Sequence, residues 1–385
     1  MKLKIGILSS VMVTLVLSFQ NSYAQDDLLF RKHLVTNAFT GLYYGIAADI
    51  IFEIDNAAAA GIPVITSGAS VLVPLLMNPE KKIDYDALVL NGHGKTIGWV
   101  HGMALATLIG GENAWLGGGE GENKNYKITV GLGALSSIGM GLLGKSLARN
   151  NDWSEGRVEL YRHYGWVMPF TGFSVAAAFS DEPRVFGGAL LLGGAGGYLL
   201  ADKINQWHNF TRGEVRAVQT LSTLTLGLGY GILADRANRL DIGVDEFKRT
   251  DWLLPAAGVL AGTLIGHLWV KDTELTPQQG MITAYAATGG ALIGLGGALI
   301  TGSDNITPYY LLPCAGGIAA YAVAVEMMRK RNSSQAFLPD SHKSNFQVSI
   351  MPHNLFINNK IEQNGYMING KHTGLQPLVA ASFVF

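Results

Sequence analysis

Apolar stretches of about twenty residues alternate with short polar connections along most of the chain, and a length near twenty matches a bilayer-spanning helix. The sequence predicts ten such segments, which we group into five pairs. The pairs are 33–52 with 61–77, 94–111 with 126–148, 156–178 with 184–204, 213–234 with 252–270, and 276–301 with 307–329.

Four of the segments share one glycine spacing, in which a second glycine follows the first by sixteen residues. The glycine pairs are Gly94 and Gly110, Gly156 and Gly172, Gly213 and Gly229, and Gly280 and Gly296. The four copies start 62, 57 and 67 residues apart, and self-similarity that recurs along a chain is the mark of a repeat architecture, in which each unit is one supersecondary element. We therefore predict that the apolar pairs are repeats of one hairpin.

Signals at the segment ends favour helices over strands. Thr211 with Glu214 three residues later is a capping box, and Thr276-Pro277-Gln278-Gln279 combines a cap with proline at the first helical position. Ser154 stands at a comparable start, and basic residues follow several segment ends, where they complement the helix dipole.

Strand-like alternation occurs in two places, over 130–133 and 223–231, where glycine or threonine takes every second position. An outer-membrane β-barrel uses such alternation, but its lumen positions are polar and its rims aromatic. We therefore predict a mainly α, membrane-type bundle of about five glycine-rich helical hairpins, with the outer-membrane β-barrel as the alternative.

Glycines recur at every fourth residue on two segments. On a helix this spacing makes one smooth groove, which lets a neighbouring backbone approach closely, as small residues do in membrane helices. Mid-helix glycines are otherwise unfavourable by about 1 kcal/mol each relative to alanine. We assign a helix-packing role to the two rows and to the repeated glycines: Gly94, Gly98, Gly102, Gly110, Gly172, Gly229, Gly258, Gly262, Gly266 and Gly296.

The two ends of the chain differ from this body. Residues 1–24 have basic Lys2 and Lys4, an apolar core and a Ser22-Tyr23-Ala24 cleavage site, so we expect a signal peptide before a body over 25–331. A polar linker follows over 332–344. Residues 345–385 alternate apolar and polar positions between Asn- and Gly-rich turns, which predicts a β-rich tail. Its last strand, ending on Phe385, resembles the terminal strand of bacterial outer-membrane proteins.

The distribution of charged residues indicates the cellular compartment of the protein. The chain is 48% apolar and only 15% charged, with a net charge of −1, which gives no electrostatic case for nucleic-acid binding. Connections within pairs sum to −8, whereas connections between pairs sum to zero. Positive-inside orientation would put the neutral side in the cytoplasm, but a cleaved signal puts Gln25 outside. We expect an outer membrane of a diderm bacterium, with the inner membrane or periplasm as alternatives.

Few residues suggest chemistry. Asn91–Thr96 (NGHGKT) lacks the first glycine of a phosphate loop, and the single cysteine, Cys314, excludes a disulfide within the chain and a Cys-based zinc site. His101 and His163 each follow the first glycine of their repeat by seven residues, and Asp49 is the acid placed deepest in an apolar segment. These three form a candidate polar path, because ionisable groups within a membrane are often functional.

No set of nucleophile, base and acid has a readable spacing, so we expect neither an enzyme nor a cofactor or metal site. We expect an exported integral envelope protein with a structural or complex-assembly role, whose partners are membrane lipid and other envelope proteins or further copies of itself. The alternative is a pore or transporter for a small solute, which should carry inward-facing charges on several segments.

Overall fold

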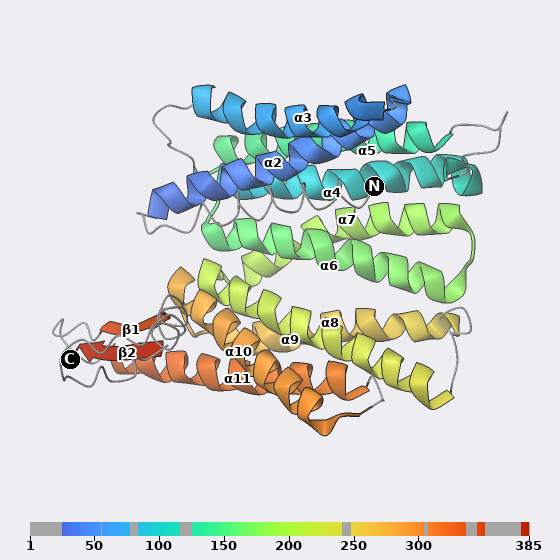
Figure 1. Ribbon diagram of the computed structural model, residues 1–385. Helices are drawn as coiled ribbons and strands as arrows, with labels where there is room; N and C mark the ends of the chain where they lie inside the picture. The colour runs from blue at the N-terminus through green and yellow to red at the C-terminus, as the bar shows by residue number, and fades with distance from the viewer. Residues whose placement is uncertain are drawn as a thin grey trace, which may run out of the picture. The chain divides into compact units, whose positions relative to one another are not determined.

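The computed structural model of the protein describes residues 25–54, 56–77, 84–115, 125–240, 248–303, 307–335, 345–350 and 379–384. The predicted signal peptide, most of the predicted linker and the middle of the predicted tail lie outside these ranges. Ten α-helices fall within them (Figure 1): α2 (Gln25–Phe52), α3 (Asn56–Met77), α4 (Tyr85–Gly110), α5 (Asn125–Asn150), α6 (Glu155–Phe179), α7 (Pro183–Trp207), α8 (Arg212–Leu240), α9 (Leu253–Val270), α10 (Pro277–Thr301) and α11 (Thr307–Gln335).

These helices form five successive hairpins. The helix α2 packs on α3, α4 on α5, α6 on α7, and α8 on α9. Gly290 of α10 meets the backbone of Gly316 in α11, so the fifth pair packs in the same way. The prediction of a mainly α bundle is therefore confirmed, whereas the sequence repeat itself is not tested by these contacts and stays a prediction.

Successive hairpins contact one another in a regular order. The first helix of each hairpin touches the first helix of the next, in the series α2, α4, α6, α8 and α10. In addition, α2 touches α5, α4 touches α7, and α6 touches α9. In Figure 1, the first helix of each hairpin ends on the right and the second helix begins there, whereas each following hairpin begins on the left. We call the left the between-hairpin end and the right the within-hairpin end.

Side-chain caps explain several helix starts. Thr276 Oγ1 accepts a hydrogen bond from the Gln279 amide at 3.2 Å, and Gln279 Oε1 accepts one from the Thr276 amide at 2.9 Å. Thr211 and Glu214 exchange the same two bonds at the start of α8. Such boxes satisfy amides that a helix start would leave unpaired. Both predicted capping boxes are thus present.

The β-barrel alternative is wrong. The alternating stretches 130–133 and 223–231 lie inside α5 and α8. Some of their glycines lie where helices pack closely: a Cβ at Gly133 would lie under 3 Å from the Trp99 ring, and one at Gly229 under 3 Å from the Leu254 carbonyl oxygen. The two-residue alternation therefore does not indicate strands here, and the helix caps predict the secondary structure correctly.

Eight of the helices are long and apolar enough to cross a membrane, namely all except α4 and α6. Large apolar side chains are exposed on their outer faces, among them Leu192, Ile293 and Ile300, with exposed fractions of 76%, 79% and 89%. In water such surfaces would be unfavourable, whereas lipid covers them at no cost. The chain is therefore a membrane-type helical protein.

The strands β1 (Asn345–Ile350) and β2 (Val379–Val384) belong to a separate unit, 333–385. They pair antiparallel, with Asn345 opposite Val384 and Ile350 opposite Val379. The residues between them lie outside the described ranges. The wider β-rich tail over 345–385 stays a prediction.

Candidate functional site

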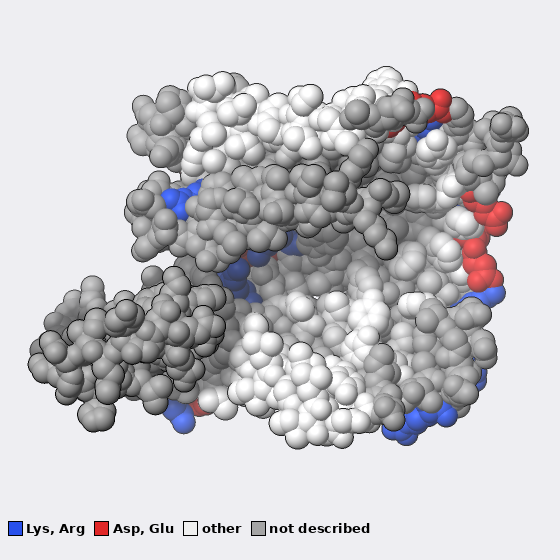
Figure 2. Space-filling model, in the orientation of Figure 1, with Lys and Arg blue, Asp and Glu red and all other residues white. Residues whose placement is uncertain are grey.

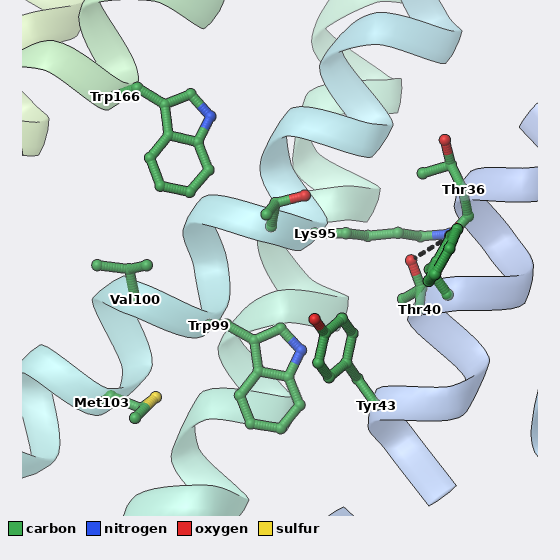
Figure 3. A pocket seen from close by; sticks show the side chains of 10 residues that line it. Thr36, Thr40, Tyr43, Lys95, Trp99, Val100, Met103 and Trp166 are labelled. Atoms are coloured by element: carbon green, nitrogen blue, oxygen red, sulfur yellow. Dashed lines mark hydrogen bonds between the residues drawn. The ribbon is translucent and has the colours of Figure 1, made fainter. Parts of the chain in front are cut away.

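A groove opens between α2, α4 and α6 and encloses about 540 Å³. Figure 3 shows that Lys95 and Trp99 of α4 and Tyr43 of α2 meet in it, with Trp166 of α6 on the opposite wall. The remaining lining residues are Thr36, Phe39, Thr40, Thr96, Val100 and Met103. We refer to these ten residues as the α2–α4–α6 groove.

The chemistry of the groove changes along its length. Lys95 and Thr96 lie one turn of α4 before Trp99 and Val100, and Met103 lies one turn further on (Figure 3). The helix α2 runs in the same direction, because both helices open a hairpin, and it contributes Thr36 before Tyr43. The groove therefore has Lys95 and Thr96 toward the between-hairpin end, where Trp166 also lies, and Trp99, Val100 and Met103 toward the other.

Lys95 is held by an amide rather than by an acid. Its Nζ donates to Asn37 Oδ1 at 2.8 Å, and Asn37 Nδ2 lies 3.0 Å from His33 Nε2. No carboxylate of the described residues forms an ion pair with Lys95. The groove thus contains a cation whose charge the described part of the chain leaves unbalanced.

A smaller pocket of about 210 Å³ adjoins the groove and shares Thr36, Thr96 and Trp166 with it. His93 and Arg162 line this second space. His93 Nε2 lies 3.0 Å from the Tyr198 hydroxyl of α7. In Figure 2, some Lys and Arg side chains lie inside a hollow of the helical unit, and others lie beside Asp and Glu at the right-hand end of the view.

Arg162 also belongs to a closed polar network at the junction of α4, α6 and α8. Its Nη2 lies 2.6 Å from Glu159 Oε2 and donates to Gln219 Oε1 at 3.0 Å. Glu159 is fully buried and also accepts bonds from the Tyr85 hydroxyl and, at 3.0 Å, from Gln219 Nε2. Every charge of the network is therefore paired inside the protein.

The three residues of the predicted polar path do not meet. His101 Nδ1 lies 3.3 Å from Met140 Sδ, and its ring packs against Gly194 of α7. His163 Nε2 lies 3.1 Å from Thr263 Oγ1 at the interface of α6 with α9. Asp49 stands three residues before the end of α2. The two histidines thus occupy separate helix interfaces, and Asp49 lies near the end of another helix.

The predicted packing glycines lie, with two exceptions, where helix backbones approach closely. A Cβ added at Gly94, Gly98 or Gly102 would come within 3 Å of the α5 backbone, and the same holds for Gly172 against Ala189. Gly258 and Gly262 meet α8 equally closely, as Gly229 meets α9, and Gly266 is slightly looser, 3.1 Å from Val218 Cα. A Cβ at Gly110 would meet only that of Ala114, at 3.2 Å, and one at Gly296 would meet nothing within 4 Å.

The sequence does not predict the groove. Asn91–Thr96 resembles an incomplete phosphate loop, but these residues lie inside α4 and form no loop. The signal that points to Lys95 is its position, because it is the only charged residue between Asp86 and the end of α4. Among the described residues, no group of three His, Cys, Asp or Glu side chains is placed to hold a metal ion.

Comparison with known proteins adds no family: no family model matches the chain, and neither a curated protein nor a solved structure matches it.

Proposed function

We propose that this chain is an exported integral protein of the cell envelope, in the outer membrane, with a structural or complex-assembly role. The observation that carries the proposal is the contrast between its interior and its surface. Buried charges such as Glu159 are paired with neighbouring side chains, whereas the outer faces of the helices present large apolar residues. Paired interior charges favour a rigid scaffold, and an apolar surface favours burial in lipid or against apolar partners.

The assembly role can be tested in cells. The full-length protein, extracted from separated inner and outer membranes in a mild detergent, should come from the outer-membrane fraction. On a native gel it should migrate well above one mature chain, which is lighter than the 41.1 kDa of the whole sequence. Replacing exposed Leu192 and Leu199 of α7 by serine should reduce the larger species without changing the helical circular dichroism. A protein that migrates as one chain from either membrane would contradict the proposal.

A pore or transporter remains the second candidate because of one observation, the cation of Lys95 in an open groove. Purified protein in liposomes distinguishes the two candidates. A scaffold should leave the flux of small organic anions at the level of protein-free liposomes. A flux that depends on the protein and falls in Lys95→Gln would favour the transporter.

A further inference from the structure

The α2–α4–α6 groove has the polarity of a single lipid molecule. Its cationic end lies at Lys95 and its aromatic and apolar end at Trp99, Val100 and Met103. Lys95 and Met103 are eight positions apart, which corresponds to about 12 Å of helix at about 1.5 Å per residue. A ligand that fills this groove must therefore carry an acidic group at one end and a hydrocarbon chain at the other.

The charge of the groove also requires a partner. The Lys95 ammonium contacts the neutral Asn37 amide at 2.8 Å, and the nearby Lys145 adds positive charge rather than neutralising it. An ionised lysine within a membrane is unfavourable unless it is paired. A bound anion would supply the negative charge that no carboxylate of the described residues provides to Lys95.

We propose that the α2–α4–α6 groove binds an anionic phospholipid, with its phosphate at Lys95 and one acyl chain along Trp99, Val100 and Met103. The volume of about 540 Å³ accommodates a chain of this kind and lies within the usual range of ligand pockets, about 300–1,000 Å³. The inference rests on the membrane embedding proposed above but not on the assembly role.

Binding can be measured on the purified full-length chain in an uncharged detergent. Native mass spectrometry should show that phosphatidylglycerol binds roughly five- to tenfold more tightly than phosphatidylcholine with the same acyl chains, the preference one interfacial lysine provides. Lys95→Gln should reduce this preference to within about twofold, and Lys95→Arg should keep it. The matched control is Lys271→Gln, an exposed lysine just after α9, which should leave the preference unchanged.

Acyl-chain placement gives a second readout that does not depend on the headgroup. Phosphatidylglycerol with brominated chains should quench part of the tryptophan fluorescence, and Trp99→Phe should remove much of the quenched component. Trp207→Phe, which alters an exposed ring at the end of α7, should not. The helical circular dichroism of each variant checks that it has folded.

Three results would overturn the inference. Undiminished phosphatidylglycerol preference in folded Lys95→Gln would place the headgroup elsewhere. Full displacement of the lipid by inorganic phosphate would indicate a site for a small anion, in which the acyl chain of the lipid contributes nothing to binding. Equal quenching in Trp99→Phe and wild type would show that the acyl chain does not lie in the groove. None of these bears on the proposed function, which fails separately if alkaline carbonate extracts the protein from membranes.

Discussion

Removing the Glu159 carboxylate should destabilise the protein more than removing any exposed acid. Glu159 is fully buried between α6, α4 and α8 and accepts bonds from Tyr85, Arg162 and Gln219. In Glu159→Ala, Arg162 loses its only carboxylate among the described residues, and the Tyr85 hydroxyl loses its acceptor. Breaking a buried ion pair costs about 3–5 kcal/mol, and an unsatisfied buried hydroxyl costs about 1–3 kcal/mol.

These two costs overlap, because one side chain satisfies both partners and effects within one network do not add. We therefore expect Glu159→Ala to lower the free energy of unfolding by about 3–5 kcal/mol. The matched control is Glu326→Ala, which removes a half-exposed carboxylate 3.4 Å from Arg329 Nη1. Exposed pairs contribute about 0–1 kcal/mol, so this variant should change the free energy little.

The assay is unfolding in mixed micelles, followed by far-ultraviolet circular dichroism as denaturing detergent is added. A double-mutant cycle with Arg162→Met isolates the pair, because removing both charges should cost less than the sum of the single losses. A loss in Glu159→Ala within about 1 kcal/mol of that in Glu326→Ala would refute the view that the network stabilises the junction of three helices.

Three further predictions concern export, packing and orientation. The mature protein should begin at Gln25, as N-terminal sequencing will report; an intact Met1 on the membrane-inserted form would contradict the predicted signal peptide. Gly262→Leu should cost about 1–3 kcal/mol or more, because its side chain would press on Ser222 and Thr225, whereas Gly289→Leu, which meets nothing within 4 Å, should be neutral or slightly stabilising, as the same unfolding assay will measure. In a Cys314→Ser background, an impermeant thiol reagent on intact cells should label Glu112→Cys and Glu182→Cys but spare Gln206→Cys and Asp272→Cys; labelling one residue from each pair would be incompatible with the hairpin layout.

Local signals were sufficient for the helices. The capping boxes at Thr211 and Thr276 act within four residues, so their presence can be read directly from the sequence. The alternation of glycine and threonine with apolar residues over 223–231 is compatible with a β-barrel, because glycine and threonine suit both a strand and a tightly packed helix. The close contact of Gly258 and Gly262 with α8 resolves that ambiguity, and it depends on the tertiary structure.

The groove could not be predicted because its walls are distant in sequence. Asn37 and Lys95 are 58 residues apart, and only the contact of α2 with α4 brings them together. The equal spacing of His101 and His163 within their repeats gives them equivalent positions but not a shared path. His101 packs against α7 and His163 against α9, in each case the second helix of the following hairpin, so the two side chains lie at separate interfaces.

The order of contacts has a consequence for how the chain folds. The substantial contacts between described helices of this unit join partners within one hairpin or in two successive hairpins. Each hairpin therefore docks on the one before it in the sequence, and none depends on a distant part of the chain. Stacked arrays of this kind propagate from a nucleus, and short sequence separations favour fast folding. A chain truncated after α7 should therefore still form its first three hairpins in their final contacts.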